Sequence, residues 1–192
     1  MNNILIPILG CFSLLSVASA ALASADDIGW SKPINGLRTR LLVLPSPKDN
    51  APFCRVFIEF ENVDDVAGQK RIRFSPGKLS LRVSDKEGKE LLPANGPYDG
   101  RLPLWEAIAL PYAGTIRFQI SFPGLGYRPG TDKVIVDVGD GKAWVVPQNG
   151  STYFLSGSFS IEKEKSDHPH MDWSGTLELP KVEIPRTNQI KK

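Results

Sequence analysis

The sequence predicts an all-β protein, an antiparallel immunoglobulin-like β-sandwich of about eight or nine short strands. Apolar residues recur at every second position in several segments, as they do in strands that bury one face. The 192 residues include 17 glycines and 16 prolines, an excess that indicates many turns. The segment closest to a helical pattern, residues 104–110, is bounded by proline on both sides, so no long helix is expected.

The clearest alternation lies in residues 79–85, 116–122 and 153–161. Each segment places apolar side chains on one face and serine, arginine or glutamine on the other, as a half-buried strand requires. Two turns, at residues 85–88 and at Asp140-Gly141, are each suited to closing a hairpin. Less regular strands are expected at residues 37–44, 53–61, 71–74 and 176–179.

The N-terminus has the pattern of a secretory signal peptide. Residues 1–25 carry no charged side chain, and an apolar run leads into small residues that allow cleavage after Ala20 or after Ala25. The apolar core is too short to span a bilayer. An alternative is a lipoprotein box that ends at Cys11 and would be acylated there. Either pattern predicts an exported protein, periplasmic or extracellular.

The mature chain is expected to form a single sandwich domain over residues 26–184, followed by a flexible basic tail at 185–192. No transmembrane segment is expected to remain after cleavage. The chain has 23 Lys and Arg against 21 Asp and Glu, a formal charge of +2, which argues against nucleic acid as a partner.

Cys54 is expected to be a buried apolar residue and not a nucleophile. Removal of the leader also removes Cys11, which leaves Cys54 without a disulfide partner. Its position in the alternation matches Val56, Ile58 and Phe60, which share the apolar face of the predicted strand.

One predicted hairpin is apolar on both faces. Pairing across Asp140-Gly141 places Asp137 opposite Trp144 and Ile135 opposite Val146, so that these four side chains share a face. Either a loop or tail covers this face, or Trp144, Ile135, Val146 and Asp137 form an exposed patch that binds a ligand.

The sequence contains only weak indications of a catalytic or metal site. His168 and His170 alternate between carboxylates and could ligate a metal, but further ligands would have to come from elsewhere in the chain. No phosphate-binding loop or nucleophile elbow occurs, and no cofactor is expected. The candidate carboxylates for glycoside hydrolysis, whose spacing the sequence does not fix, are Asp99, Glu106, Asp132, Asp137 and Asp140.

Both ends of the domain resemble a family. The motif Trp30-Ser-Lys-Pro-Ile-Asn-Gly-Leu-Arg-Thr-Arg-Leu41, the strand Arg55–Asn62 and the late segment Trp173–Pro180 are similar to exported bacterial proteins of uncharacterised function with immunoglobulin-like folds. The resemblance implies a sandwich fold and an envelope location, and it transfers no catalytic residue.

These observations favour an exported, non-catalytic β-sandwich that binds a protein or cell-envelope partner. One alternative is a carbohydrate-binding module, for which four Trp and four Tyr offer stacking surfaces. The other is an enzyme, either a glycosidase or a metal-dependent hydrolase that uses His168 and His170.

Overall fold

The protein folds into antiparallel β-strands, as the sequence predicts. The structure, a computed structural model, describes residues 29–45, 53–66, 68–95, 106–121, 133–138, 142–163 and 171–186. These stretches contain no α-helix. They contain a one-turn 3-10 helix, η2 (Pro76–Lys78), and the strands β1 (Leu37–Pro45), β2 (Cys54–Asn62), β3 (Gln69–Phe74), β4 (Leu79–Asp85), β5 (Glu90–Leu91), β6 (Ala94–Asn95), β7 (Glu106–Pro111), β8 (Thr115–Gln119), β9 (Lys133–Asp137), β10 (Lys142–Pro147), β11 (Tyr153–Ile161) and β12 (Gly175–Glu183).

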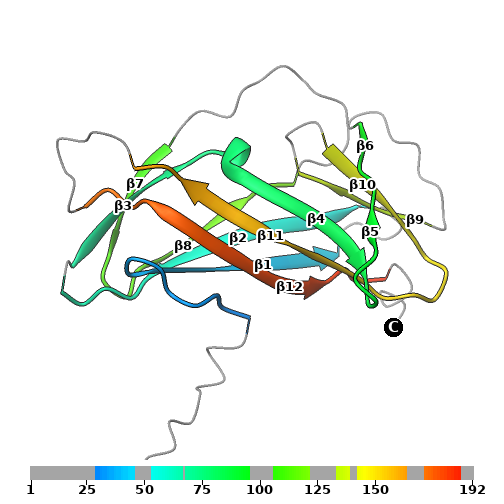
Figure 1. Ribbon diagram of the computed structural model, residues 1–192, viewed down its shortest axis with the longest axis horizontal. Coiled ribbons are helices and arrows are strands. Elements are labelled where there is room, and N and C mark those ends of the chain that lie inside the picture. Colours follow the sequence, from blue (N-terminus) through cyan, green and yellow to red (C-terminus); the bar gives the residue numbers. More distant parts are fainter. Residues whose placement is uncertain are drawn as a thin grey trace, which may run out of the picture.

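Two sheets form the centre of the molecule, in the orders β1-β2-β8 and β12-β11-β4-β5. In Figure 1 the strands β4, β11 and β12 lie in front of β1, β2 and β8. Burial alternates along β1 and β2, because successive side chains of a strand point to opposite faces and only one face meets the other sheet. The apolar faces of both sheets join in one core.

An aromatic cluster fills this core. Phe60 on β2 meets Phe159 on β11 with ring centroids 4.9 Å apart, a contact that joins the two sheets. Phe74 on β3 stacks on Phe118 of β8 at 4.3 Å. Trp173, just before β12, stacks on Phe159 at 5.8 Å. Edge-to-face and stacked pairs of this kind add about 0.5–1.5 kcal/mol each to the free energy of area burial.

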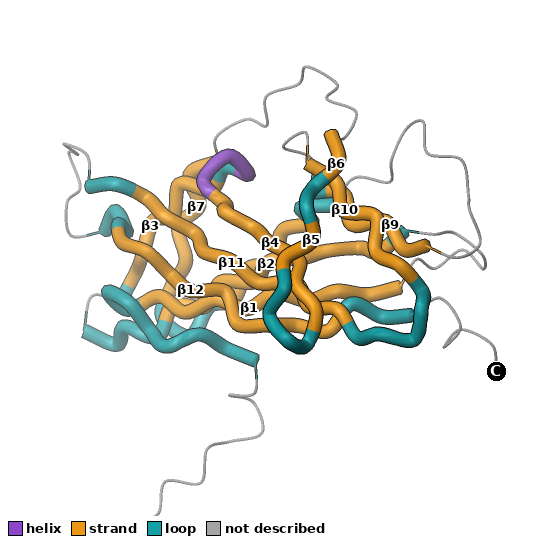
Figure 2. Tube along the Cα trace, turned by 45° about the vertical axis from the view of Figure 1, so that its right-hand side comes forward, coloured by secondary structure: helices purple, strands orange, loops and turns teal. Residues whose placement is uncertain are grey.

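Two smaller sheets extend the ends of the molecule (Figure 2). At one end, β3 pairs with β7, and the other edge of β3 pairs with the segment before β12. The Arg71 amide donates to the Met171 carbonyl at 2.7 Å, and the Trp173 amide donates to the Arg71 carbonyl at 3.0 Å. At the other end, the sheet β6-β10-β9 meets the start of β2 through a bridge from Phe53 to Ile135.

Most predicted strands are confirmed, and residues 79–85 and 153–161 match β4 and β11 at both ends. The predicted turn at residues 85–88 is also confirmed, since the Gly88 amide donates to the Asp85 carbonyl at 3.1 Å and β5 follows. Strands β5, β6 and β7 were not predicted. Two of them have only two residues each, too few to show an alternation.

The hairpin of β9 and β10 pairs one residue away from the predicted register. Asp137 lies opposite Ala143, and not opposite Trp144 as the sequence predicted. Val138 donates its amide to the Lys142 carbonyl at 3.4 Å, so three residues join the two arms in place of the expected two. A shift of one residue moves a whole strand's side chains to the other face.

The observed register places Trp144 and Val146 in the core with alternate valines of β9. The Trp144 side chain is 1% exposed, and its Nε1 donates to the Leu91 carbonyl at 3.1 Å. Ile135 and Asp137 lie on the opposite face and are buried as well. The predicted face shared by Trp144, Ile135, Val146 and Asp137 is therefore wrong.

Both ends of the predicted domain lie partly outside the described residues. The leader at 1–25, including Cys11, is outside them, as are residues 187–192 of the predicted tail. The first residues of that tail are held in place, because Arg186 Nη2 donates to the Gly150 carbonyl at 2.9 Å.

Replacing Trp144 with Ala should lower the free energy of unfolding by about 3–5 kcal/mol, because the change leaves a cavity in the core. Leu92, which is 91% exposed, provides the control, and Leu92→Ala should change stability by less than about 0.5 kcal/mol. Urea unfolding followed by tryptophan fluorescence and circular dichroism measures both. Equal effects of the two substitutions would contradict the core position of Trp144.

Candidate functional site

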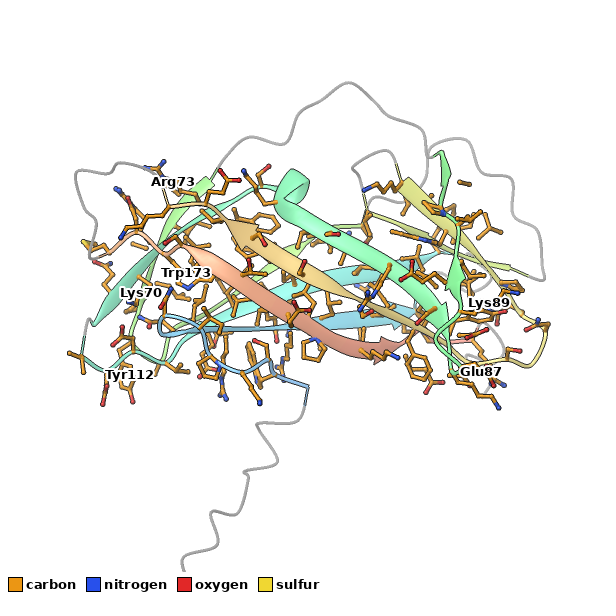
Figure 3. All side chains as sticks on the ribbon, viewed as in Figure 1. Lys70, Arg73, Glu87, Lys89, Tyr112 and Trp173 are labelled. Carbon is orange, nitrogen blue, oxygen red and sulfur yellow. The ribbon has the colours of Figure 1, made fainter. Side chains whose placement is uncertain are left out.

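A polar cleft of about 680 Å³ lies at the end of the molecule where β3 and β7 pair. It is formed by the turn before β1, the loop between β2 and β3, and segments on either side of the β11–β12 connection. Its lining residues are Pro33, Asn35, Gly36, Val63, Asp64, Asp65, Lys70, Lys163, Asp172, Trp173 and Ser174. Figure 3 labels two of them, Lys70 and Trp173, at this end of the ribbon. Loops held by rigid sheets are common positions for binding residues.

One wall of the cleft is a two-residue turn at Asn35 and Gly36. Both residues have positive φ, 49° and 77°, as a type I′ turn requires. Ile34 and Leu37 exchange two backbone hydrogen bonds across the turn, at 2.9 and 3.0 Å. Gly36 is also required by space, because a Cβ atom there would lie 2.3 Å from the Cβ of Asp64. The Asn-Gly pair was a usable hairpin signal that sequence reasoning missed.

The loop after β2 is held by a buried asparagine. Asn62 Nδ2 donates to the Leu110 carbonyl at 3.0 Å, and its Oδ1 accepts from the Asp64 amide at 3.0 Å. These bonds direct Asp64 toward the cleft, where its Oδ2 lies 2.7 Å from Lys70 Nζ. This ion pair is mostly shielded from water, which limits the screening that weakens exposed pairs.

The opposite wall is anchored by Asp172. Arg71 binds this carboxylate in a bidentate contact. Its Nε donates to Oδ1, and its Nη2 donates to Oδ2 at 2.7 Å. Two-pronged contacts of this kind fix orientation as well as distance. The neighbouring Trp173 Nε1 donates to the Ile34 carbonyl at 2.8 Å, and Asn35 Nδ2 donates to the Ser174 carbonyl at 2.8 Å. The two walls are thus tied together although they lie far apart in the sequence.

Two exposed apolar side chains stand beside the cleft at the tips of neighbouring loops. Val66, in the loop between β2 and β3, is 93% exposed, and Tyr112, between β7 and β8, is 55% exposed. The loops are joined because the Tyr112 amide donates to the Gly68 carbonyl at 2.5 Å. Figure 3 shows Tyr112 at this end of the molecule. We call Val66 and Tyr112 the tip pair.

The chemistry of the cleft suits reversible binding. It offers both carboxylates and ammonium groups, including the exposed side chains of Asp65 and Lys163. Within the described stretches, no three His, Cys, Asp or Glu side chains are grouped to hold a metal ion. The cleft can therefore form ion pairs and hydrogen bonds with a ligand, while the tip pair supplies apolar contact area.

The predicted ligand-binding residues lie elsewhere. Trp144, Ile135, Val146 and Asp137 belong to β9 and β10 near the other end of the molecule, and all four are buried. Because all four are buried, they do not form an exposed apolar patch. Ligand binding by these four residues stays a prediction, and their burial does not favour it.

The remaining predicted positions lie outside the described residues. His168 and His170 are among them, so the proposed metal loop is not tested. The same holds for the carboxylates of Asp99, Asp132 and Asp140 and for the side chain of Glu106.

The aromatic residues available for sugar stacking are few in the described stretches. Trp144 and Trp173 are buried, and Trp30 lies against Arg38 and Arg40, with the guanidinium of Arg40 4.5 Å from its ring centroid. Tyr112 is the exposed aromatic side chain in this part of the chain.

Cys54 is buried on the inner face of β2, as predicted. Burial raises the pKa of its thiol to about 12, because the thiolate loses its hydration in the core. The thiol is therefore protonated at neutral pH and is not a nucleophile.

Comparisons with protein-family models, with curated proteins and with solved structures found no match for this chain. Among the described residues, no helix combines the length and the apolar character needed to cross a membrane. The candidate site therefore rests on the geometry of the cleft and its rim.

Gly36→Ala should destabilise the protein more than Gly88→Ala. Both glycines have a positive φ, which costs a side-chain-bearing residue about 1–2 kcal/mol. Only Gly36 faces a steric clash, with Asp64, which should add about 1–3 kcal/mol, whereas a Cβ at Gly88 would meet nothing within 4 Å. Urea unfolding measures the difference, and equal losses would contradict the close packing of this wall.

Cys54 should resist alkylation by iodoacetamide at pH 8 in the folded, processed protein and react within minutes once urea unfolds it. Because the folded pKa of about 12 exceeds the reference value of 9.0, the unfolded chain loses its proton first. The contribution of Cys54 to stability should therefore be complete below pH 9.0 and fall as the pH rises toward 12. Unfolding of the wild type and of Cys54→Ala at pH 8 and at higher pH tests this sign.

Proposed function

We propose that this protein is an exported, non-catalytic binding domain that recognises a protein partner of the cell envelope through the cleft and the tip pair. The proposal keeps the export and the immunoglobulin-like sandwich predicted by the sequence. Two facing antiparallel sheets around one aromatic core are compatible with that architecture.

The observation that carries the proposal is the tip pair beside the polar cleft. Val66 is 93% exposed and Tyr112 is 55% exposed, so neither side chain is buried in the free protein. Apolar side chains exposed on two joined loops form the kind of patch that partners cover. A polar cleft beside the patch adds direction through hydrogen bonds and ion pairs.

The loops are also prepared for binding. Asn62 fixes the loop that carries Val66, and the backbone bond from Tyr112 to Gly68 fixes the two tips relative to one another. Loops already held in place lose less conformational entropy when a partner binds, so more of the contact energy appears as affinity.

A photo-crosslinking amino acid placed at position 66 or 112 should give a discrete adduct in the cells that produce the protein. The matched control is position 92, where Leu92 is equally exposed but lies near the opposite end of the molecule. Adducts at 66 and 112 but not at 92, with one partner identified by mass spectrometry, support the proposal. No adduct, or the same adducts at all three positions, contradicts it.

The identified partner then allows a direct measurement. The double variant Val66→Ser/Tyr112→Ser should weaken its binding by at least about tenfold, since large apolar side chains at the centre of a contact dominate affinity. Leu92→Ser should leave the dissociation constant unchanged. Unchanged affinity of the double variant would assign binding to another surface.

A further inference from the structure

The outer face of the sheet β1-β2-β8 carries a second, different surface. Its side chains alternate with those of the core, and its cations are all arginines. They are Arg38 and Arg40 on β1, Arg55 on β2 and Arg117 on β8, and we call this surface the arginine face. It shares no residue with the cleft or the tip pair.

The charges on the arginine face do not balance. Arg38 Nε donates to Glu61 Oε2 at 2.8 Å. Glu59 is shared: Arg40 Nε donates to its Oε2 at 2.5 Å, and Arg117 Nε donates to its Oε1 at 2.6 Å. Among the described side chains of this sheet, two carboxylates thus face four guanidiniums, an excess of two positive charges.

The excess lies around Phe57. Arg55 forms no ion pair within the described residues, and its Nε is buried there without a hydrogen-bond acceptor. Its guanidinium carbon lies 5.9 Å from the Phe57 ring centroid, and that of Arg117 lies 5.7 Å from the same centroid. Arg55 as a whole is only partly buried, and a guanidinium without a counter-ion among the described residues favours the approach of an anion.

Arginine is suited to oxyanions. The guanidinium presents a planar fork of donors that matches phosphate and carboxylate, and it is more weakly hydrated than the ammonium of lysine. Stacking against Phe57 and Trp30 holds the guanidiniums in place before a ligand arrives.

The spacing of the cations favours a surface of many anions over one small ligand. Strands of a sheet lie about 4.8 Å apart, and alternate residues of a strand lie about 6.8 Å apart. The arginines are therefore spread over the width of the sheet. The same face carries the partly exposed Leu44 and the half-buried Trp30, residue types that enter the interfacial zone of a bilayer readily.

We infer that the arginine face docks onto a membrane surface that contains anionic phospholipid, with Arg55 and Arg117 taking phosphate oxygens. Phosphodiester headgroups supply monoanionic oxyanions spread in a plane, which complements the unbalanced guanidiniums. The predicted export, which brings the processed chain to the cell envelope, gives this face access to such a membrane. Each basic residue close to an anionic leaflet raises the partitioning of a protein onto the membrane about fivefold. At 0.1 M salt this attraction decays over a distance of about 10 Å.

The test is sedimentation of the processed protein, isolated from the cells that produce it, with lipid vesicles. Vesicles of phosphatidylcholine plus phosphatidylglycerol should bind it at least about tenfold better than vesicles of phosphatidylcholine alone, and high salt should abolish the difference. Intact mass fixes the N-terminus of every sample, so wild type and variants are compared in the same form.

Arg55→Gln is the deciding variant, because Arg55 has no ion pair in the described chain whose loss could disturb the fold. It should lower binding to the anionic vesicles about fivefold. The control is Arg82→Gln, an equal change of charge at an exposed position on β4 of the other sheet, which should leave binding unchanged. Arg117→Lys, which keeps the charge needed beside Glu59, should weaken binding less than Arg55→Gln.

Equal binding to neutral and anionic vesicles, or equal losses in Arg55→Gln and Arg82→Gln, would overturn the inference. Binding to polygalacturonate in place of the vesicles would overturn it as well and would assign the face to acidic polysaccharide. The crosslinks at positions 66 and 112 do not depend on this face, so failure of either proposal is distinguishable from failure of the other.

Discussion

The aromatic contacts between the two main sheets are the constraint on which the rest of the structure depends. Phe60 and Phe159 bring β2 and β11 together, and Trp173 extends the cluster toward the cleft. Trp173 makes two contacts that fix its position: its ring stacks on Phe159, and its Nε1 donates a hydrogen bond to the Ile34 carbonyl. The turn that forms one wall of the cleft is therefore positioned by the core, and a change in core packing would move the wall.

Carboxylates that bind arginine side chains are the polar counterpart of this cluster. Glu59 is 3% exposed although it points to the outer face, because the arginines of the neighbouring strands cover it. Removing one partner of such a group is costly, whereas the intact pair contributes little net stability. Glu59 and Asp172 instead orient the arginine side chains that bind them, because those side chains would otherwise sample many rotamers.

The sequence predicted what depends on local periodicity and missed what depends on distant contacts. The strand at Tyr153–Ile161 follows directly from alternation, because its inward residues are apolar. The burial of Glu59 was missed, since it depends on cations supplied by two other strands. The cleft could not be predicted either, because the bond from Asn35 to Ser174 joins residues 139 positions apart.

The register error at Trp144 has a different origin. Asp-Gly is a strong signal for a two-residue turn, but a three-residue connection with the same pair is also common, and the two differ by one step in register. Alternation could not separate them, because both faces of this hairpin are apolar. Register is specified strongly only where the two faces of a strand differ in polarity.

The N-terminal segment connects the export prediction with the arginine face. The Ser31 amide donates to the Thr39 carbonyl at 2.8 Å, and the Thr39 amide donates to Ser31 Oγ at 3.0 Å, so this segment covers part of the edge of β1. Covered edges are protected against pairing with other chains. The same bonds set Trp30 beside Arg38 and Arg40, which places the first described residues next to the surface inferred to meet the membrane. A leader that ends at Ala25 would leave only a few residues between its cleavage site and that face, a span of at most about 3.6 Å per residue.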